Sequence, residues 1–340
     1  MSAFKAYLDR KDVHISAKRY FVDAMGAMAL GLFASLLIGT IFSQLSDLLH
    51  FPWLATAAGY AKSATGPAMA CAIGMALRAP NLVLFSLLGV GAGANALGGP
   101  LGTLFCAIFA SEVGKLVSKT TKVDILVTPT VTILSGVALA SLIGPGISQL
   151  MTWLGNLIMS ATELQPFLMG AIVSVIVGMI LTLPISSAAI CTMLSLTGLA
   201  GGAATAGCCA QMVGFAVMSF YENRWGGLVA QGLGTSMLQM GNIVKNPRVW
   251  IPPTLAAAIT GPIATMVFAM QNGIPVASGM GTCGLVGPIG VMAWDGFGSA
   301  WSWVGLIAVC FVLPAILTPL IALPMRKMGW IKQGDLKLDL

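Results

Sequence analysis

Apolar residues fill most of the chain in long runs, which are separated by short clusters of charged or polar residues. A helix needs about 20 apolar residues to cross a bilayer, and the run at residues 20–44 is the first that is long enough. Later apolar runs lie at residues 66–77, 81–95, 101–114, 124–143, 167–183, 207–221, 250–270 and 301–323. The pattern predicts a bundle of helices that cross a membrane repeatedly.

The composition identifies the environment of the chain. Only 8% of the residues are charged and 57% are hydrophobic, with a mean hydropathy of +0.91. A soluble domain has about 25% charged residues, so the sequence predicts an integral membrane protein. The apolar runs continue to residue 323, so the first is not a removable signal peptide.

Cationic clusters predict the orientation of the chain. Because cytoplasmic loops are enriched in Lys and Arg, all four clusters and both termini are expected on the cytoplasmic side. The clusters consist of Lys5, Arg10, Lys11, Lys18 and Arg19; Lys115, Lys119 and Lys122; Lys245 and Arg248; and Arg326, Lys327, Lys332 and Lys337. An even number of crossings must separate any two of them, which gives about ten. These clusters account for most of the net charge of +6, so no nucleic-acid partner is expected.

Two polar, glycine-rich regions do not fit as ordinary spans. The number of crossings leaves residues 184–199 and 273–290 as re-entrant hairpins, which protein must bury on all sides. Residues 67–77 (PAMACAIGMAL) resemble residues 184–194 (PISSAAICTML), which indicates either an internal repeat or a coincidence within a small apolar alphabet. If the repeat is real, the broken regions of the two halves mark the binding site.

We therefore predict an all-α polytopic membrane protein with about ten transmembrane helices and two re-entrant hairpins. Residues 81–95 and 101–114 count as two crossings separated by a glycine-rich stretch, and residues 146–165 as an interfacial helix or bent connector. The predicted segments are a cytoplasmic N-terminal segment (1–19), a first transmembrane half (20–145), the amphipathic connector (146–165), a second transmembrane half (166–325) and a cytoplasmic tail (326–340).

The sequence shows no catalytic constellation. It has no phosphate-binding glycine loop, zinc-protease motif, nucleophile elbow or paired CxxC cysteines, and its two histidines are His14 and His50. The seven cysteines lie in apolar runs without metal-ligand spacing and are expected to pack as small hydrophobes. We therefore predict no catalytic residue, no cofactor and no metal site.

One polar stretch lies between apolar neighbours at residues 222–253 (ENRWGGLVAQGLGTSMLQMGNIVKNPRVWIPP). An ionisable group at membrane depth costs roughly 2.5–3.5 kcal/mol, so such groups usually face a cavity or each other. The candidate solute-binding residues here are Glu222, Asn223, Arg224, Gln231, Thr235, Gln239 and Asn242. In this interpretation Arg224 keeps Glu222 ionised. The alternative is an ion pair at an exposed loop tip.

The remaining candidates each have a structural alternative. Thr235, Gln239 and Asn242 have helical spacing, and such a stripe lines a pathway or forms hydrogen bonds between helices. Ser186 and Ser187 are solute donors at the first hairpin or bond their own backbone. The last candidates are Asp295, which follows the second hairpin and is otherwise an outer-loop acid, and Asn246, Pro247 and Pro252, which are expected to shape a turn.

Residues 243–253, IVKNPRVWIPP, resemble the I-V-x-N-P-x-x-x-I-P signature of EIIC, the membrane component of the bacterial phosphoenolpyruvate-dependent sugar phosphotransferase system. The chain is most similar to the glucose/lactose type, within the divergent group that includes perfringolysin-regulator proteins. The resemblance implies a homodimer in the lipid of the bacterial cytoplasmic membrane, with residues 20–145 as the dimerising half and residues 166–325 as the ligand-binding transport half. It further implies elevator-like movement of the second half and soluble phosphocarrier proteins acting in trans.

The chain also departs from this pattern. Sugar-transporting members carry an acid about eleven positions before the asparagine of the signature, where this chain has Thr235. Their substrate-contacting histidine has no counterpart, because no histidine follows His50. Two functions stay open: a permease for a sugar or similar solute, with or without coupled phosphorylation, and a membrane sensor that binds ligand without phosphotransfer. A proton- or sodium-coupled carrier has less support, because Glu222 and Asp295 are the acids suited to that role in the second half.

Overall fold

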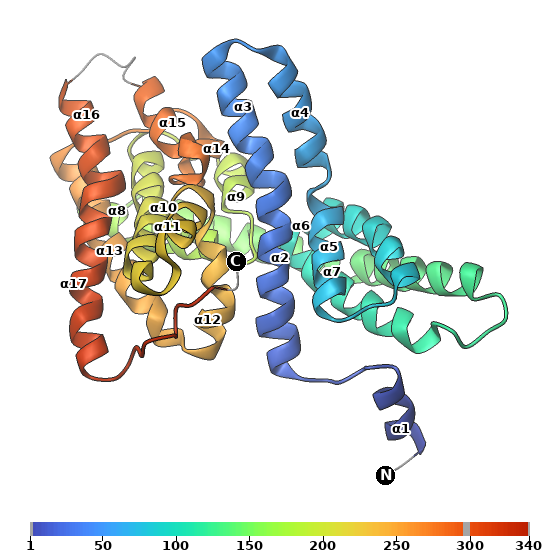
Figure 1. Ribbon diagram of the computed structural model, residues 1–340. Coiled ribbons are helices and arrows are strands. Elements are labelled where there is room, and N and C mark those ends of the chain that lie inside the picture. Colours follow the sequence, from blue (N-terminus) through green and yellow to red (C-terminus); the bar gives the residue numbers. More distant parts are fainter. Residues whose placement is uncertain (1–2, 295–299, 339–340) are drawn as a thin grey trace. The chain divides into compact units, whose positions relative to one another are not determined.

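The computed structural model describes residues 3–294 and 300–338, and the chain is helical with no β-strand in those ranges (Figure 1). Within them, six helical stretches are long and apolar enough to cross a membrane: Arg19–Ser43, Asn81–Val117, Asp124–Thr162, Gly198–Met218, Pro247–Val267 and Ala300–Lys327. Three shorter apolar helices are Thr65–Ala76, Pro166–Thr182 and Cys283–Trp294. The predicted all-α, multi-pass membrane protein is confirmed, whereas ten crossings and two re-entrant hairpins stay predictions.

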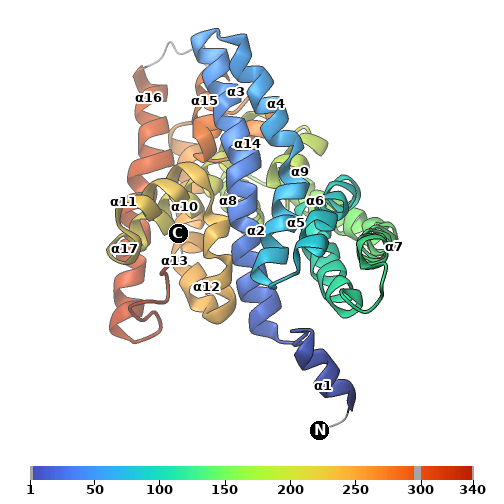
Figure 2. The same cartoon turned by 45° about the vertical axis from the view of Figure 1, so that its right-hand side comes forward.

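The chain divides into two compact units, Met1–Leu150 and Met151–Leu340. The first unit contains α1 (Ala3–Arg10), α2 (Ala24–Leu32), α3 (Ile38–Leu49), α4 (Pro52–Ser63), α5 (Thr65–Ala76), α6 (Asn81–Val117) and the beginning of α7 (Asp124–Thr162). A short π-helical turn at Arg19–Asp23 precedes α2, and a second one at Phe33–Leu37 connects α2 to α3. Helices α3 and α4 lie side by side in Figures 1 and 2.

One helix boundary of the first unit agrees with the predicted one and another differs from it. Element α6 consists of two helices that meet at a kink at Gly99, whose φ of 59° and ψ of −155° are not helical, so the predicted glycine-rich break between residues 81–95 and 101–114 is present. Helix α7 does not end near residue 143 but continues through Pro145 to Thr162. In an apolar environment a helix satisfies its own backbone, so losing one hydrogen bond at a proline costs less than ending the helix.

Lys115 is not a loop cation. It lies on α6 with a side chain that is 1% exposed, and its ammonium group is 2.8 Å from Glu112 Oε2. The same group donates to the backbone carbonyls of Asp12 (2.8 Å) and Leu77 (3.0 Å). A buried cation needs this degree of compensation, and these bonds hold the N-terminal segment against the first unit.

The second unit is built around α10 (Gly198–Met218), which contacts α8 (Pro166–Thr182), α13 (Ile251–Pro262) and α17 (Leu313–Lys327) (Figure 1). The other helices of the unit are α9 (Ser187–Met193), α11 (Phe220–Val229), α12 (Met240–Lys245), α14 (Pro275–Ser278), α15 (Val286–Trp294) and α16 (Ala300–Ile307). The predicted apolar run at residues 207–221 is thus the second part of a longer helix. The helix begins at Gly198, where Thr197 before it is extended and Gly198 itself has a φ of 62°, which glycine tolerates.

Small residues bring the helices around α10 into backbone contact. A Cβ atom added to Gly178 of α8 would lie 2.7 Å from the carbonyl oxygen of Gly207 in α10. Ser174 of α8 donates a hydrogen bond to the carbonyl of Ala257 in α13 (2.7 Å). Helices associate in lipid by such close packing, because lipid is as apolar as the helix surfaces and therefore supplies no hydrophobic driving force for association.

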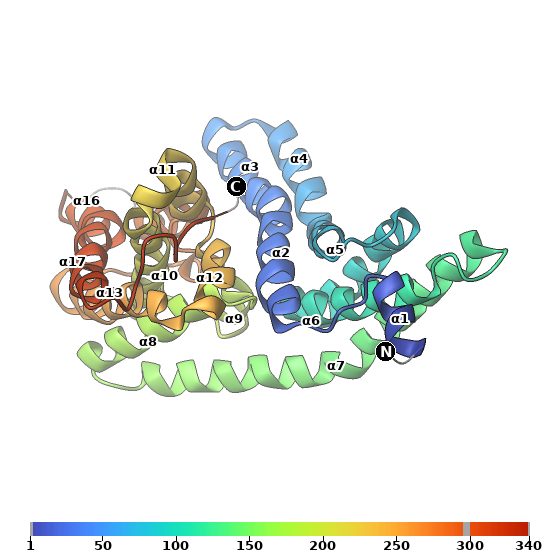
Figure 3. The same cartoon turned by 60° about the horizontal axis from the view of Figure 1, so that its bottom comes forward.

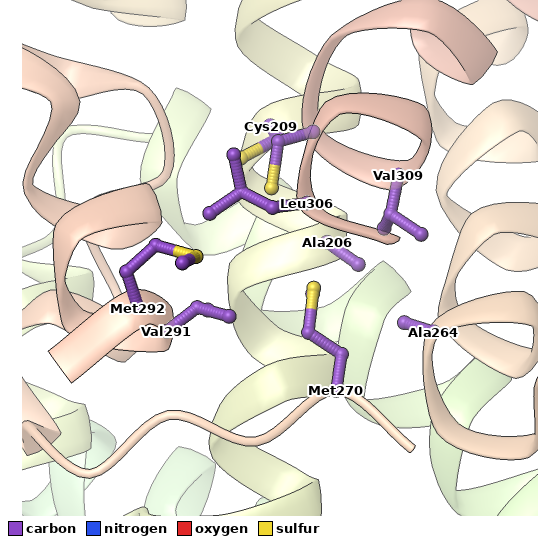
Figure 4. Packing of buried hydrophobic residues seen from close by; sticks show 9 residues of the cluster. Ala206, Cys209, Ala264, Met270, Val291, Met292, Leu306 and Val309 are labelled. Atoms are coloured by element: carbon purple, nitrogen blue, oxygen red, sulfur yellow. The ribbon is translucent and has the colours of Figure 1, made fainter. Parts of the chain in front are cut away.

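A hydrophobic cluster fixes the later helices of this unit against α10 (Figure 4). Cys209 and Ala206 of α10 pack there with Met292 from α15 and Leu306 from α16. Cys209 is fully buried, and the seven cysteines are all free thiols. These cysteines act as small apolar side chains, as the sequence indicated.

Candidate functional site

The polar stretch begins where α11 bends. Arg224 has φ 52° and ψ −151°, a combination that interrupts the helix and that non-glycine residues rarely adopt. The Glu222 side chain, two residues earlier, is 4% exposed and pairs with Arg326 at 3.4 Å. The predicted partner was Arg224, which is exposed. Arg326 lies more than 100 positions away in sequence, so local spacing could not identify it.

Neutral amides form a buried hydrogen-bonded chain next to this pair. Gln231 Nε2 donates to Ser219 Oγ (2.9 Å), and Gln239 Nε2 donates to Gln231 Oε1 (2.8 Å). Asn242 Nδ2 in turn donates to Gln239 Oε1 (2.8 Å). All four side chains belong to buried residues. The structure therefore brings Gln231, Gln239 and Asn242 together, as expected of residues that share one polar site.

Thr235 does not belong to a helical stripe with Gln239 and Asn242. Its backbone is extended (φ −157°, ψ 140°), and its hydroxyl accepts the N–H of Met237 (3.2 Å) to begin a 3-10 turn, Ser236–Gln239. The predicted continuous helix is therefore wrong at this position. A threonine oxygen next to a free backbone N–H favours a cap over a helix interior, which is the competing local preference.

The C-terminal tail, defined here as residues 329–338, contacts most of these side chains. After α17 the chain runs back alongside α12 (Figures 1 and 3). Asn223 Nδ2 donates to the carbonyl of Leu336 (2.8 Å), and so does Gln239 Nε2 (3.0 Å). Asn242 Nδ2 donates to the carbonyl of Lys337 (2.9 Å). These candidate residues are thus brought together, and their polar groups bond the tail of the same chain.

A small polar cavity of about 240 Å³ lies between the tail and the amides. Its lining consists of Asn242, Lys245, Asn246, Gly334, Asp335 and Lys337. Small-molecule sites usually measure about 300–1,000 Å³, so the space left beside the tail is below that range. The tail itself supplies half of the lining residues.

A second buried polar network contains residues that the sequence reasoning missed. Gln211 of α10 accepts from Trp250 Nε1 (3.0 Å) and donates to Thr254 Oγ1 (3.2 Å). Thr182, at the end of α8, lies 3.3 Å from the same amide oxygen and 2.8 Å from the Ser236 hydroxyl. Gln211 is the sole amide side chain in the apolar run of α10, and this isolated polar residue was the available signal.

The two predicted hairpin regions, residues 184–199 and 273–290 (the two broken regions), pack against each other. Ser187 is buried and donates to the carbonyl of Gly279 (2.7 Å), and Ser278 donates to the carbonyl of Leu196 (2.9 Å). Ser186 instead caps α9 by accepting the N–H of Ala189 (3.2 Å). In the observed state, both predicted solute donors are therefore engaged in holding the fold.

Three further predicted residues lie in or next to the turn at the start of α13. Asn246 accepts the N–H of Arg248 (3.3 Å), Pro247 occupies the first position of the 3-10 turn that follows, and Pro252 lies in the first turn of α13. Asp295 lies outside the described residues. Within the described ranges, no group of three or more His, Cys, Asp and Glu residues could hold a metal ion.

Buried amides and broken helices inside a multi-pass helical bundle are typical of membrane transport proteins. Residues 22–338 match the family described as phosphotransferase system, EIIC, and the chain belongs to this family. It is therefore a membrane component of sugar transport by the phosphotransferase system, as the signature at residues 243–253 indicated. No curated protein and no solved structure matches the chain.

Proposed function

We propose that the chain is an EIIC-type permease for a small polar solute, a sugar or a sugar-like molecule, and that the second unit binds it. The observation that carries the proposal is the buried amide chain Gln231–Gln239–Asn242 beside Glu222. Amides donate and accept hydrogen bonds as sugar hydroxyls require. A membrane protein has to compensate each buried polar group, so such a cluster is more typical of a ligand site than of packing alone.

We further propose that the second unit moves as one body, in an elevator-like manner, while the first unit forms the dimer contact. The bonds Ser187–Gly279 and Ser278–Leu196 support this, because they connect the two broken regions to each other within the unit. In this proposal residues 184–199 and 273–290 are re-entrant hairpins. The division of the chain after Leu150 falls inside the predicted connector, residues 146–165, which fits a joint between a fixed and a moving part.

Any phosphoryl group must come from a separate soluble protein in this proposal. Two features support this: no histidine follows His50 in the sequence, and the cysteines are mostly buried. We propose that Lys245 and Arg248, which are exposed, contribute to docking of that partner.

A membrane sensor that no longer transfers phosphate is the second candidate. Two observations favour it: Thr235 stands where sugar-transporting relatives have an acid, and the Glu222 carboxylate is already bonded to Arg326 and the tail. Both functions require a ligand, and they differ in whether the ligand crosses the membrane and whether phosphoenolpyruvate is consumed.

The first experiment measures ligand-induced thermal stabilisation of the purified protein in detergent, with a panel of sugars, polyols and small anions. A ligand at a hundredfold excess over its Kd stabilises the folded state by about 2.7 kcal/mol, which is easily detected. Glu222→Gln and Gln239→Ala should abolish the response, whereas Gln165→Ala, at an exposed position, should keep it. Unchanged responses in both site variants would remove this cluster from the ligand site.

The second experiment separates the two functions. The protein is reconstituted into liposomes, and uptake of the ligand found in the panel is measured with and without phosphoenolpyruvate and soluble phosphocarrier proteins. Uptake supports the permease, and its dependence on phosphoenolpyruvate shows coupling. Binding without any uptake supports the sensor and overturns the permease.

A further inference from the structure

The tail is anchored to the second unit by its own side chains as well as by its backbone. Ile331 is 2% exposed and Leu336 is fully buried, whereas Lys332, Gln333 and Lys337 are exposed. Asn246 Nδ2 donates to the carbonyl of Trp330 (2.9 Å). A tail that acted only as a positive-charge topology signal would need its lysines and none of these contacts.

Glu222 binds two backbone amides of the tail. Its Oε1 accepts the N–H of Gly334 (3.2 Å), and its Oε2 accepts the N–H of Leu336 (2.9 Å). Gly334 has a φ of +96°, and this conformation helps to direct both amides to one carboxylate. A carboxylate that accepts backbone N–H groups makes charge-assisted bonds, which are about twice as strong as neutral ones.

Asn223 binds the next part of the tail in the way that a neighbouring β-strand would. Its Nδ2 donates to the carbonyl of Leu336 (2.8 Å), and its Oδ1 accepts the N–H of Leu338 (2.8 Å). These two groups flank Lys337, whose carbonyl accepts from Asn242 (2.9 Å). The Lys337 N–H also donates to the carbonyl of Gly334 (3.2 Å), so the site holds the tail as a turn at residues 334–337.

We propose that Glu222, Asn223, Gln239 and Asn242 form a binding site for a turn-forming peptide with the pattern Gly-Asp-Leu-x-Leu. Residues 334–338, GDLKL, are its resident ligand, and a second peptide with the same pattern can replace them. The exposed Lys337 side chain contributes little to affinity, whereas the Asp335 carboxylate accepts a hydrogen bond from Asn246 Nδ2 (2.8 Å). Peptide binding is measured without a solute, so it does not depend on the transport function proposed above.

The direct test uses a chain that ends at Met328, together with the amidated decapeptide GWIKQGDLKL (residues 329–338) carrying an N-terminal fluorophore. We expect saturable binding to the shortened chain by fluorescence anisotropy. The full-length chain should bind at least tenfold more weakly, because its own tail competes for the site. A folded shortened chain without saturable peptide binding would overturn the proposal.

Position 334 of the peptide provides a matched control. A Cβ added there meets no atom within 4 Å, so substitution changes only the backbone preference. L-alanine is disfavoured at positive φ by about 1–2 kcal/mol, which corresponds to roughly fivefold to thirtyfold weaker binding. D-alanine favours positive φ and should bind as well as glycine. Equal affinity for the two alanine peptides would show that the observed tail geometry is not what the site recognises.

A test on the full-length chain covers the case in which the shortened chain does not fold. Trypsin cleavage after Lys332 and Lys337 is followed by intact mass spectrometry, with cleavage after the exposed Lys18 as the internal standard. Glu222→Gln and Asn223→Ala should accelerate tail cleavage at least tenfold relative to that standard. Tail cleavage at the wild-type rate in both variants would contradict the proposal.

Discussion

Gly279→Ala tests the contact between the two broken regions of the second unit. Gly279 has φ −96° and ψ 4°, which alanine also tolerates, so the substitution changes the occupied space and not the backbone preference. The added Cβ would lie 2.7 Å from the carbonyl oxygen of Ser187, 2.8 Å from its carbonyl carbon and 2.9 Å from the nitrogen of Ala188. These are backbone atoms, so no side-chain rotation relieves the overlap.

The size of the effect follows from these distances. An ordinary contact between a Cβ and backbone atoms is about 3.4 Å or more, so the two segments must separate by roughly 0.5–0.7 Å. Overpacking of this kind costs about 1–3 kcal/mol. The separation also stretches the 2.7 Å hydrogen bond from Ser187 to the Gly279 carbonyl, which contributes about 0.5–1.5 kcal/mol. We expect a total loss of about 2–4 kcal/mol.

The assay is thermal unfolding in detergent followed by tryptophan fluorescence, for which the chain has eight tryptophans. A loss of this size should lower the melting temperature by roughly 5–15 °C. Gly226→Ala is the matched control, because a Cβ there meets nothing within 4 Å, and it should leave the melting temperature unchanged or raise it. In a Ser187→Ala background the Gly279→Ala cost should fall by about 1 kcal/mol. A Gly279→Ala protein that melts with the wild type would refute the close contact between the two segments.

Three further outcomes are expected. Gln211→Ala should cost about 1–3 kcal/mol of unfolding free energy, measured by denaturant titration against Gln165→Ala, because it leaves a partly buried indole N–H without its acceptor. The hydrogen bond from Arg19 lowers the pKa of Asp12. The stability that Asp12 adds is therefore present above its unfolded pKa and is lost as the pH falls below about 4. Melting curves of the wild type and Asp12→Asn should differ at pH 7 and converge in acid. Cys71 is partly exposed whereas the other cysteines are buried, so a small maleimide should modify Cys71 first, as peptide mapping will show.

Apolar run length located many of the helices but not all of their ends. The predicted runs at residues 66–77 and 167–183 agree with α5 (Thr65–Ala76) and α8 (Pro166–Thr182) to within a residue or two, because a polar or proline-containing boundary follows each run. The predicted break at Gly99 is present as a kink, whereas the prediction failed at Pro145. There a residue that usually ends helices in water lies inside α7, because a helix in an apolar environment keeps its remaining backbone hydrogen bonds.

The sequence also could not predict which groups the polar side chains would bond. The polar stretch at residues 222–253 could be recognised, since amides between apolar neighbours are unusual. That the C-terminal tail bonds to it could not be predicted. The partners of Glu222 are Arg326, Gly334 and Leu336, all more than 100 positions away. No periodicity connects them.

The sequence by itself determined that this protein is a multi-pass helical membrane protein of the EIIC family, because run length, charge distribution and the motif at residues 243–253 are local properties of the chain. Only the tertiary structure decided that the tail fills the polar site and that Gln211 connects α8, α10 and the turn at Trp250. Those contacts depend on which distant segments meet when the second unit packs. Hydrogen bonding between buried polar groups selects that arrangement, since each group left without a partner would destabilise the fold.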